Sequence, residues 1–167
     1  FMWRAPWDEE EVPTELPIVF EDDHFFAVSK PPGLPVHPSA RYYKNTLIKL
    51  LEGARPNEKV SLVHRIDRET SGLILISKTK QADRLLKKML ENRDGIEKIY
   101  LAITWGVPSM GEVGAPFRLE RSLKLDPRSS YKVEMIVSDD DDAQYAATRF
   151  SIVETKAPTP ERVYALV

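Results

Sequence analysis

The first third of the sequence alternates between short apolar runs and polar breaks. Residues 18–20 (Ile-Val-Phe) and 25–29 (Phe-Phe-Ala-Val-Ser) are rich in residues that favour strands, and the polar residues 21–24 separate them. Short β-prone runs bounded by polar, turn-forming residues are typical of neighbouring strands. The pattern therefore predicts two strands joined by a turn.

Two later stretches have the spacing of helices. In residues 47–53, leucines fall three and four positions apart, Asn45 or Thr46 can cap the start, and a glycine stands at the end. The second and clearer helix is predicted over residues 79–92, where apolar side chains recur on one stripe and the basic side chains lie largely off it. The stripe consists of Ala82, Leu85, Leu86, Met89 and Leu90.

The remaining apolar runs predict strands. Residues 73–76 form a continuous apolar run that reads as a buried strand leading into the second helix. The chain therefore contains more strand than helix, which indicates an α+β fold. Further strands are predicted at residues 99–105, 133–137, 145–153 and 162–167.

The composition is that of an ordinary globular chain. Its 167 residues are 42% hydrophobic and 30% charged, which suits one domain with a core of its own. The absence of cysteine excludes thiolate-ligated zinc, iron–sulfur clusters and thiol nucleophiles, and it favours a reducing, cytoplasmic setting. No apolar run approaches the roughly 20 residues that cross a bilayer, so no membrane partner is expected. The start at Phe1 suggests an excerpt from a longer chain.

Two segments are unusually rich in proline. Residues 1–17 contain three prolines and the acidic run 8–11, which favours an extended arm or linker ahead of the folded domain. Residues 30–38 contain four prolines and one glycine. Because proline fixes φ and removes a backbone donor, this second segment is expected to be a rigid, ordered loop.

The net charge of −2 conceals an uneven distribution. Residues 1–40 carry 2 basic and 8 acidic side chains, residues 41–100 carry 14 and 8, and residues 101–167 carry 8 and 10. The middle segment is therefore basic, with a net charge of +6. Solvated helix faces and a surface that binds nucleic acid both fit this pattern.

The densest polar cluster is residues 64–72, His-Arg-Ile-Asp-Arg-Glu-Thr-Ser-Gly. Its flanks are apolar, which indicates a polar loop held by rigid elements. Asp67 stands between Arg65 and Arg68, so its carboxylate is expected to stay ionised, which suits a nucleophile or a base. A purely structural interpretation is also open, in which Asp67 binds its own loop and pairs with a neighbouring arginine.

This cluster resembles the signature H-R-L-D-x-x-T-S-G-L of the RluA-type pseudouridine synthases, with Ile66 in place of leucine. Residues 21–38 resemble the earlier E-D-x-x-x-x-V-x-K-P-x-G-x-x-V-H-P segment of that family, and residues 98–106 resemble its K-x-Y-x-A-x-x-x-G strand. The resemblance implies a pseudouridine synthase catalytic domain over residues 18–167. It also implies the fold of that family, a mixed and mostly antiparallel sheet flanked by helices and loops.

The resemblance further implies isomerisation of specific uridines to pseudouridine in ribosomal or transfer RNA, with no cofactor and no metal. Asp67 matches the catalytic aspartate, and Tyr100 matches the tyrosine that stacks on the target base and is a candidate for the proton step. Arg65 matches the arginine that holds or replaces the extruded nucleotide. The predicted substrate-binding loop is completed by His64, Arg68, Thr70, Ser71 and Gly72.

The residue types suit this chemistry. Breaking a glycosidic bond develops opposite charges on sugar and base, which a carboxylate and a cation can stabilise. Extruding a base costs a few kcal/mol, and phosphate contacts from Arg41, Lys44 or Arg68 could offset it.

Several alternatives stay open at this point. The sequence ends before the T-G-R-T-H-Q-I-R segment that follows in the family, so an incomplete catalytic domain is expected, and a non-catalytic RNA-binding relative is the first alternative. A glycoside- or nucleoside-hydrolysing enzyme would use Asp67 with Glu69, whose separation the sequence does not fix. A metalloenzyme is disfavoured because none of the three histidines has helical ligand spacing.

Overall fold

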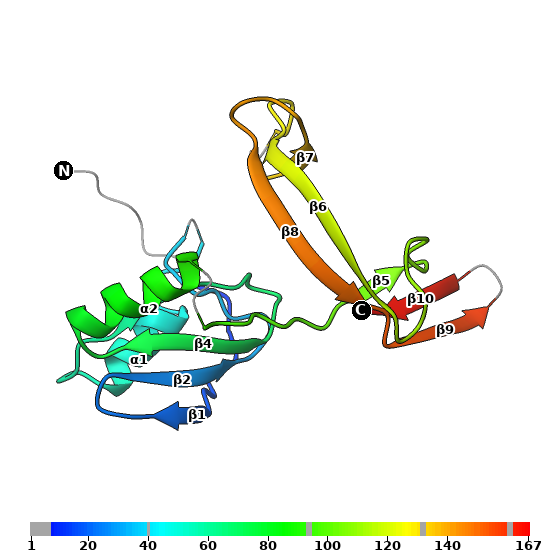
Figure 1. The fold of residues 1–167 in the computed structure, drawn as a ribbon. Helices are drawn as coiled ribbons and strands as arrows, with labels where there is room; N and C mark the ends of the chain where they lie inside the picture. The colour runs from blue at the N-terminus through cyan, green and yellow to red at the C-terminus, as the bar shows by residue number, and fades with distance from the viewer. Residues whose placement is uncertain (1–7, 40, 93–94, 131–132, 160–161) are drawn as a thin grey trace. The chain divides into compact units, whose positions relative to one another are not determined.

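The computed structural model describes residues 8–39, 41–92, 95–130, 133–159 and 162–167 (Figure 1). It divides the chain into two compact units, Phe1–Glu97 and Lys98–Val167, which we describe separately. Among the described residues, no helix is long and apolar enough to cross a membrane.

The first unit is built on a four-stranded antiparallel sheet in the order β1-β2-β4-β3 (Figure 1). The register of β2 against β4 places Lys30 opposite Gly72. The loop that leaves β2 therefore lies next to the loop that enters β4. The strands are β1 (Ile18–Glu21), β2 (Phe25–Lys30), β3 (Ser61–Leu62) and β4 (Gly72–Ser77), and the helices are α1 (Leu47–Ala54) and α2 (Lys80–Asn92).

Alternate side chains of β2 and β4 point to the same face of the sheet and form the core of this unit. Phe26 and Val28 are fully buried and pair across the sheet with Ile76 and Ile74, so that all four side chains lie on one face. Leucines of α1 pack against the same cluster. The apolar spacing that predicts α1 is thus explained by burial against β2 and β4.

The elements predicted in this unit are confirmed, with small shifts at their ends. Thr46 occupies the N-cap of α1 in an extended conformation, although its side chain makes no capping bond, and the helix continues past Gly53 to Ala54. The second helix begins at Lys80, where the hydroxyl of Thr79 accepts the backbone N–H of Ala82 at 3.1 Å. Thr79 therefore serves as the cap.

The second unit holds two three-stranded antiparallel sheets, in the orders β5-β10-β9 and β7-β6-β8. The long strands β6 and β8 run side by side over most of their lengths (Figure 1). The strands are β5 (Ile103–Trp105), β6 (Pro116–Leu125), β7 (Met135–Val137), β8 (Gln144–Ser151), β9 (Glu154–Thr159) and β10 (Arg162–Leu166).

The α+β prediction is confirmed, and the strands form three sheets rather than one. The strand predicted at 99–105 is shorter than expected, because only its last three residues belong to β5. Ala102 nevertheless exchanges two backbone hydrogen bonds of 2.9 Å with Val167. The sequence analysis missed β3, β6 and β9.

Candidate active site

The polar cluster identified in the sequence forms the loop between β3 and β4. Its start is fixed by the N–H of Val63, which donates to the carbonyl of Leu75 at 3.0 Å. Its middle forms a tight turn, in which the N–H of Thr70 donates to the carbonyl of Asp67 at 3.1 Å. The loop is thus anchored on the buried strand β4, and its turn begins at the candidate catalytic residue.

A fully buried lysine binds the backbone of this loop. Lys30, the last residue of β2, has no exposed surface, and its ammonium group donates to the carbonyls of Pro31 at 2.8 Å, Leu34 at 2.9 Å and Arg68 at 2.9 Å. Burial lowers its pKa, and the nearby Glu69 carboxylate opposes that shift. The three carbonyls satisfy all three donors of the ammonium group, as a buried charge requires.

The proline-rich loop is also fixed on both sides, as its composition predicts. The N–H of Gly33 donates to the carbonyl of Arg68 at 2.8 Å, and the N–H of Leu47 in α1 donates to the carbonyl of Pro35 at 2.8 Å. Gly33 has φ +84°, a left-handed backbone conformation that residues other than glycine rarely adopt. This loop therefore connects α1 to the loop of Asp67.

His64 braces the start of the polar loop against the sheet. Its Nε2 accepts the backbone N–H of Leu75 at 3.2 Å. An imidazole nitrogen that accepts a hydrogen bond carries no proton, so the proton of neutral His64 is on Nδ1. The side chain is half-buried, which fits a role in shaping the loop.

Asp67 is exposed, and among the described residues its side chain takes part in no hydrogen bond or ion pair. The neighbouring Arg68 instead donates from Nε to Glu69 at 2.6 Å and from Nη1 to the hydroxyl of Tyr42 at 2.9 Å. The purely structural interpretation requires Asp67 to pair with a neighbouring arginine. Arg68 does not form that pair, because it binds Glu69 and Tyr42. The Asp67 carboxylate is accessible to a ligand.

The other predicted loop residues lie on either side of Asp67 in the sequence. Arg65 and Ser71 are exposed, and Thr70 closes the turn through its backbone. Gly72 begins β4 with φ +135°, which only glycine adopts readily. The structure thus brings the predicted residues from His64 to Gly72 together on one loop.

Tyr100 lies in the second unit, just before β5, and 60% of its surface is exposed. Tyr100 and Asp67 belong to different units, and their joint action stays a prediction.

Sequence reasoning gave no role to Lys30 or to Tyr42, although both bind the loop of Asp67. The pairing of a lysine with the following proline in the V-x-K-P-x-G segment was the available signal for Lys30. Tyr42 carried no signal, because its contact with Arg68 joins residues 26 positions apart.

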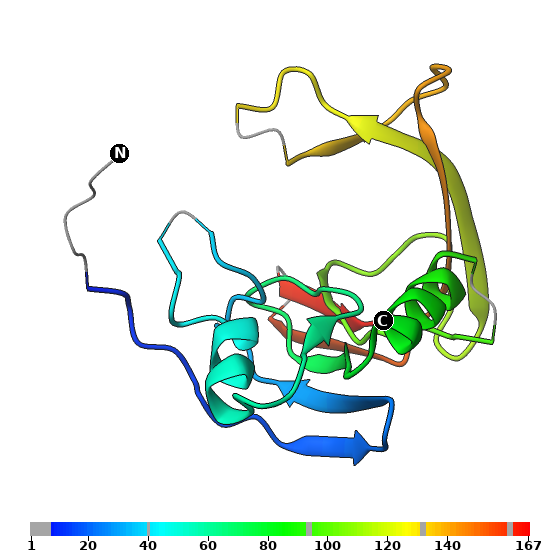
Figure 2. The same ribbon diagram turned by 90° about the vertical axis from the view of Figure 1, so that its left-hand side faces the viewer.

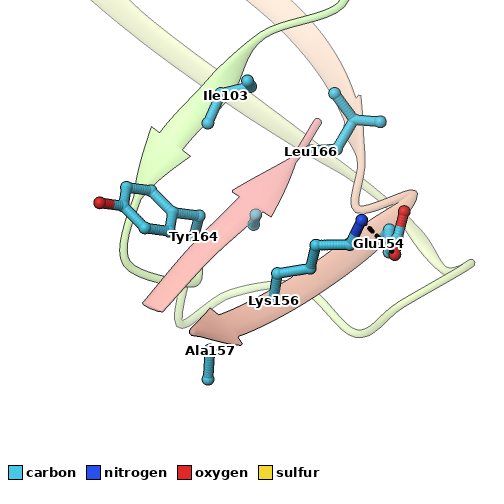
Figure 3. A pocket seen from close by; sticks show the side chains of 7 residues that line it. Ile103, Glu154, Lys156, Ala157, Tyr164 and Leu166 are labelled. Atoms are coloured by element: carbon cyan, nitrogen blue, oxygen red, sulfur yellow. Dashed lines mark ion pairs between the residues drawn. The ribbon is translucent and has the colours of Figure 1, made fainter. Parts of the chain in front are cut away.

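A cavity of about 650 Å³ lies on the sheet of β9, β10 and β5 (Figure 3). Its wall is mainly apolar, and its charged side chains Glu154 and Lys156 pair with each other at 3.4 Å. None of the predicted site residues lines this cavity, so we assign it no catalytic role. Among the described residues, no group of three or more histidine, cysteine, aspartate or glutamate side chains could hold a metal ion.

Comparison with known proteins identifies the class to which this loop belongs. The family model for RNA pseudouridylate synthase matches residues 24–167, which include the whole loop. The chain belongs to the RNA pseudouridylate synthase family.

Curated relatives of this family are similar over most of the chain. Ribosomal large subunit pseudouridine synthase D of Zymomonas mobilis is 35% identical over 155 residues, which cover 87% of this chain and 45% of the relative. The protein of the same name from Pseudomonas aeruginosa is 39% identical over 118 residues, covering 68% of this chain and 36% of the relative. The chain thus spans less than half the length of these two pseudouridine synthases.

Solved structures support the fold. The human RNA pseudouridylate synthase domain containing 1 superposes with a TM-score of 0.71 at 18% identity, covering 94% of this chain and 60% of that structure. The human RNA pseudouridylate synthase domain containing 4 gives 0.62 at 23% identity, covering 89% and 56%. The α+β arrangement of the present chain is therefore that of RNA pseudouridylate synthase domains.

Proposed function

We propose that the protein containing this chain isomerises uridines of RNA to pseudouridine, with Asp67 as the catalytic residue. The observation that carries the proposal is the state of the Asp67 carboxylate. It is exposed and makes no side-chain bond among the described residues, while the backbone next to it is held by a buried ammonium group. Such a group can react with a ligand without first breaking an internal bond.

The reaction class suits this arrangement. The N-glycosidic bond of the target uridine must break, the uracil must turn over, and a carbon–carbon bond must form. Asp67 would act by nucleophilic attack or by proton abstraction, either of which needs a positioned carboxylate. Rigid support of the loop by Lys30 and β4 would keep that carboxylate in place without rearrangement during the reaction.

Other loop residues are proposed to hold the RNA. The exposed Arg65 lies two residues before Asp67, where it would hold the extruded nucleotide or replace it in the stack. His64, Thr70, Ser71 and Gly72 would shape the surface that the nucleotide meets.

RNA of the large ribosomal subunit is the substrate that we propose first. The curated relatives carry the name ribosomal large subunit pseudouridine synthase D, and transfer RNA is the second substrate to test. The reaction needs no oxidant or added group, so we propose that it runs without cofactor or metal. We also propose a cytoplasmic location, which the lack of cysteine in the sequence supports.

The test is to convert Asp67→Ala and Asp67→Asn in the whole protein and to map pseudouridine in RNA by mass spectrometry. We expect pseudouridine formation to fall by at least about a hundredfold, because the carboxylate takes part directly in bond breaking. RNA affinity and the unfolding temperature are expected to change little, because this side chain is exposed and takes part in no hydrogen bond or ion pair among the described residues.

Glu69→Gln is the control for the loss of an exposed carboxylate from the same loop, and unlike the Asp67 variants it also removes a charge that pairs with Arg68 at 2.6 Å. It is expected to retain activity. Undiminished pseudouridine in the Asp67 variants would overturn the proposal, and a wild-type protein that binds RNA without modifying it would support the non-catalytic relative.

A further inference from the structure

The carboxylate of Glu9 accepts hydrogen bonds from consecutive backbone N–H groups. The N–H of Lys44 donates to its Oε1 at 3.0 Å, and the N–H of Asn45 donates to its Oε2 at 2.8 Å. Burial by itself raises the pKa of Glu9, but the N–H groups of Lys44, Asn45 and Tyr43 outweigh it, so the pKa is lowered. Consecutive N–H groups that converge on one anion form a nest, a common binding site for phosphate.

The next acidic residue reaches the loop of Asp67. Glu10 accepts the hydroxyl of Tyr42 at 2.5 Å, and this hydroxyl in turn accepts Nη1 of Arg68 at 2.9 Å. The side chain of Asn45 also donates to the backbone carbonyl of Glu10 at 2.8 Å. The acidic arm thus lies on residues 42–45 and is connected through Tyr42 to the residue that follows Asp67.

Basic side chains also lie near the nest. Arg41 and Lys44 are exposed basic residues in the same short segment, and Arg68 lies on the neighbouring loop. An RNA that places a nucleotide at Asp67 must pass its phosphates over nearby protein surface. Backbone N–H groups and basic side chains are the groups that protein surfaces offer to phosphates.

The arm is attached to the core through residues that follow its acidic end. Val12 and Leu16 pack against the core, and the carbonyl of Pro17 accepts the N–H of Ser29 at 2.9 Å. The described residues before Val12 form no helix or strand, and the arm as a whole runs past the loop before α1 and then beside α1 (Figure 2). Detachment of residues 8–11 would therefore leave these contacts of residues 12–17 intact.

We propose that the N–H groups of residues 43–45 form a phosphate-binding site for RNA, and that Glu9 occupies this site as an internal competitor when RNA is absent. This inference rests on the proposed function, because it assigns a subsite and a regulation to the same RNA-binding surface. The acidic arm then lowers affinity for RNA in general, and only an RNA that offers a well-placed phosphate displaces it.

The experiment measures binding of a short fluorescein-labelled oligouridylate to the whole protein by anisotropy, for wild type, Glu9→Ala and Glu11→Ala. Glu11 is an exposed carboxylate two residues away, so its loss changes the net charge equally. We expect Glu9→Ala to bind at least about threefold more tightly than Glu11→Ala, because the competitor leaves the site; this factor corresponds to occupation by Glu9 in about two-thirds of wild-type molecules.

A second measurement tests the site directly, including the case in which Glu9→Ala folds poorly. In NMR spectra of the wild-type protein, addition of the oligouridylate is expected to shift the amide signals of Lys44 and Asn45 and to return the pKa of Glu9 to its ordinary range. In Glu9→Gln, inorganic phosphate alone is expected to shift the same amides. A role confined to holding the arm would change none of these signals.

The outcomes separate the two proposals. Equal affinities of Glu9→Ala and Glu11→Ala, weaker binding by a folded Glu9→Ala, or unchanged amide signals in the presence of bound RNA would overturn the phosphate site. A wild-type protein that binds RNA normally but forms no pseudouridine would contradict the proposed function alone. The response of Glu9→Gln to inorganic phosphate would still report on the site in that case.

Discussion

The ammonium group of Lys30 and the carbonyl oxygen of Arg68 lie 2.9 Å apart although 38 residues separate them in the sequence. The same oxygen accepts the N–H of Gly33 at 2.8 Å. Two donors from the end of β2 and the loop after it therefore use both lone pairs of this carbonyl. The backbone next to Asp67 is positioned by a strand that contributes no side chain to the predicted chemistry.

Replacing this lysine is expected to destabilise the whole first unit. Lys30→Met keeps most of the side-chain volume but leaves the carbonyls of Pro31, Leu34 and Arg68 with one donor fewer each. The Arg68 carbonyl keeps its bond from Gly33, so the carbonyls of Pro31 and Leu34 are the ones left without this donor. At roughly 1–3 kcal/mol for each unsatisfied buried group, we expect the free energy of unfolding to fall by about 2 kcal/mol or more. Denaturant unfolding measures this change, and the exposed Lys59→Met is the control. Equal losses in the two variants would contradict the anchoring role of Lys30.

Two glycines of the first unit are expected to respond oppositely to alanine. Gly33 has φ +84°, so Gly33→Ala should destabilise the protein by roughly 1–2 kcal/mol through backbone strain. Gly53 lies inside α1, and a Cβ there would meet no atom within 4 Å, so Gly53→Ala should stabilise by about 0.5–1 kcal/mol. Thermal unfolding of both variants measures the sign. A stabilising Gly33→Ala would show that the proline-rich loop is not held in its left-handed conformation.

Elements with a strong local pattern could be predicted from the sequence. The helix over residues 80–92 has an apolar stripe and a threonine cap, and its observed start differs by one residue from the prediction. The strand β6 also carries a local signal, since Phe117, Leu119, Leu123 and Leu125 alternate with polar residues at the period of a strand. Its many charged residues hid this alternation.

The contacts that organise the candidate site could not be predicted in the same way. The motif of residues 64–72 indicates which side chains carry chemistry, but the bond from Lys30 to Arg68 depends on the register of β2 and β4. The contact of Glu9 with Lys44 spans 35 residues and has no sequence pattern. A composition that favours a solvated arm gives no indication that its acidic end binds backbone N–H groups.

A partly buried ion cluster is expected to make stability depend on acid pH. Glu21 at the end of β1 receives Nη1 and Nη2 of Arg55 at 2.7 and 2.8 Å and also pairs with Lys78. The hydrogen bonds from Arg55, and then that from Lys78, lower the pKa of Glu21 to about 2 from an ordinary value of 4.5. A carboxylate with a depressed folded-state pKa stabilises the fold above its unfolded pKa, and this contribution disappears as the pH falls through the folded value.

Glu21→Gln should therefore have a lower Tm than wild type at neutral pH. The difference should shrink between about pH 4.5 and pH 2, because the unfolded wild-type chain takes up a proton at Glu21 near pH 4.5 whereas the folded protein keeps Glu21 ionised until about pH 2. Thermal unfolding monitored by circular dichroism over this pH range tests the prediction, with the exposed Glu15→Gln as the control. A Tm difference that stays constant down to pH 2 would mean that the charge of Glu21 contributes nothing.

Tyr100 is expected to affect turnover more than binding. If its ring stacks on the target base and its hydroxyl serves the proton step, Tyr100→Phe removes only the hydroxyl. Turnover should then fall by about a hundredfold or more, while RNA affinity changes by less than about threefold. Tyr100→Ala removes the ring as well, and it should also weaken RNA binding by roughly 1–3 kcal/mol.

Tyr145 offers a matched control for both variants. It lies in the same unit and has the same exposed fraction as Tyr100, 60%. Single-turnover rates and Kd values for Tyr100→Phe, Tyr100→Ala and Tyr145→Phe separate the two roles, and Tyr145→Phe should match wild type. If Tyr100→Phe lost affinity but kept its single-turnover rate, the hydroxyl would serve RNA binding, and the proton step would belong to another group.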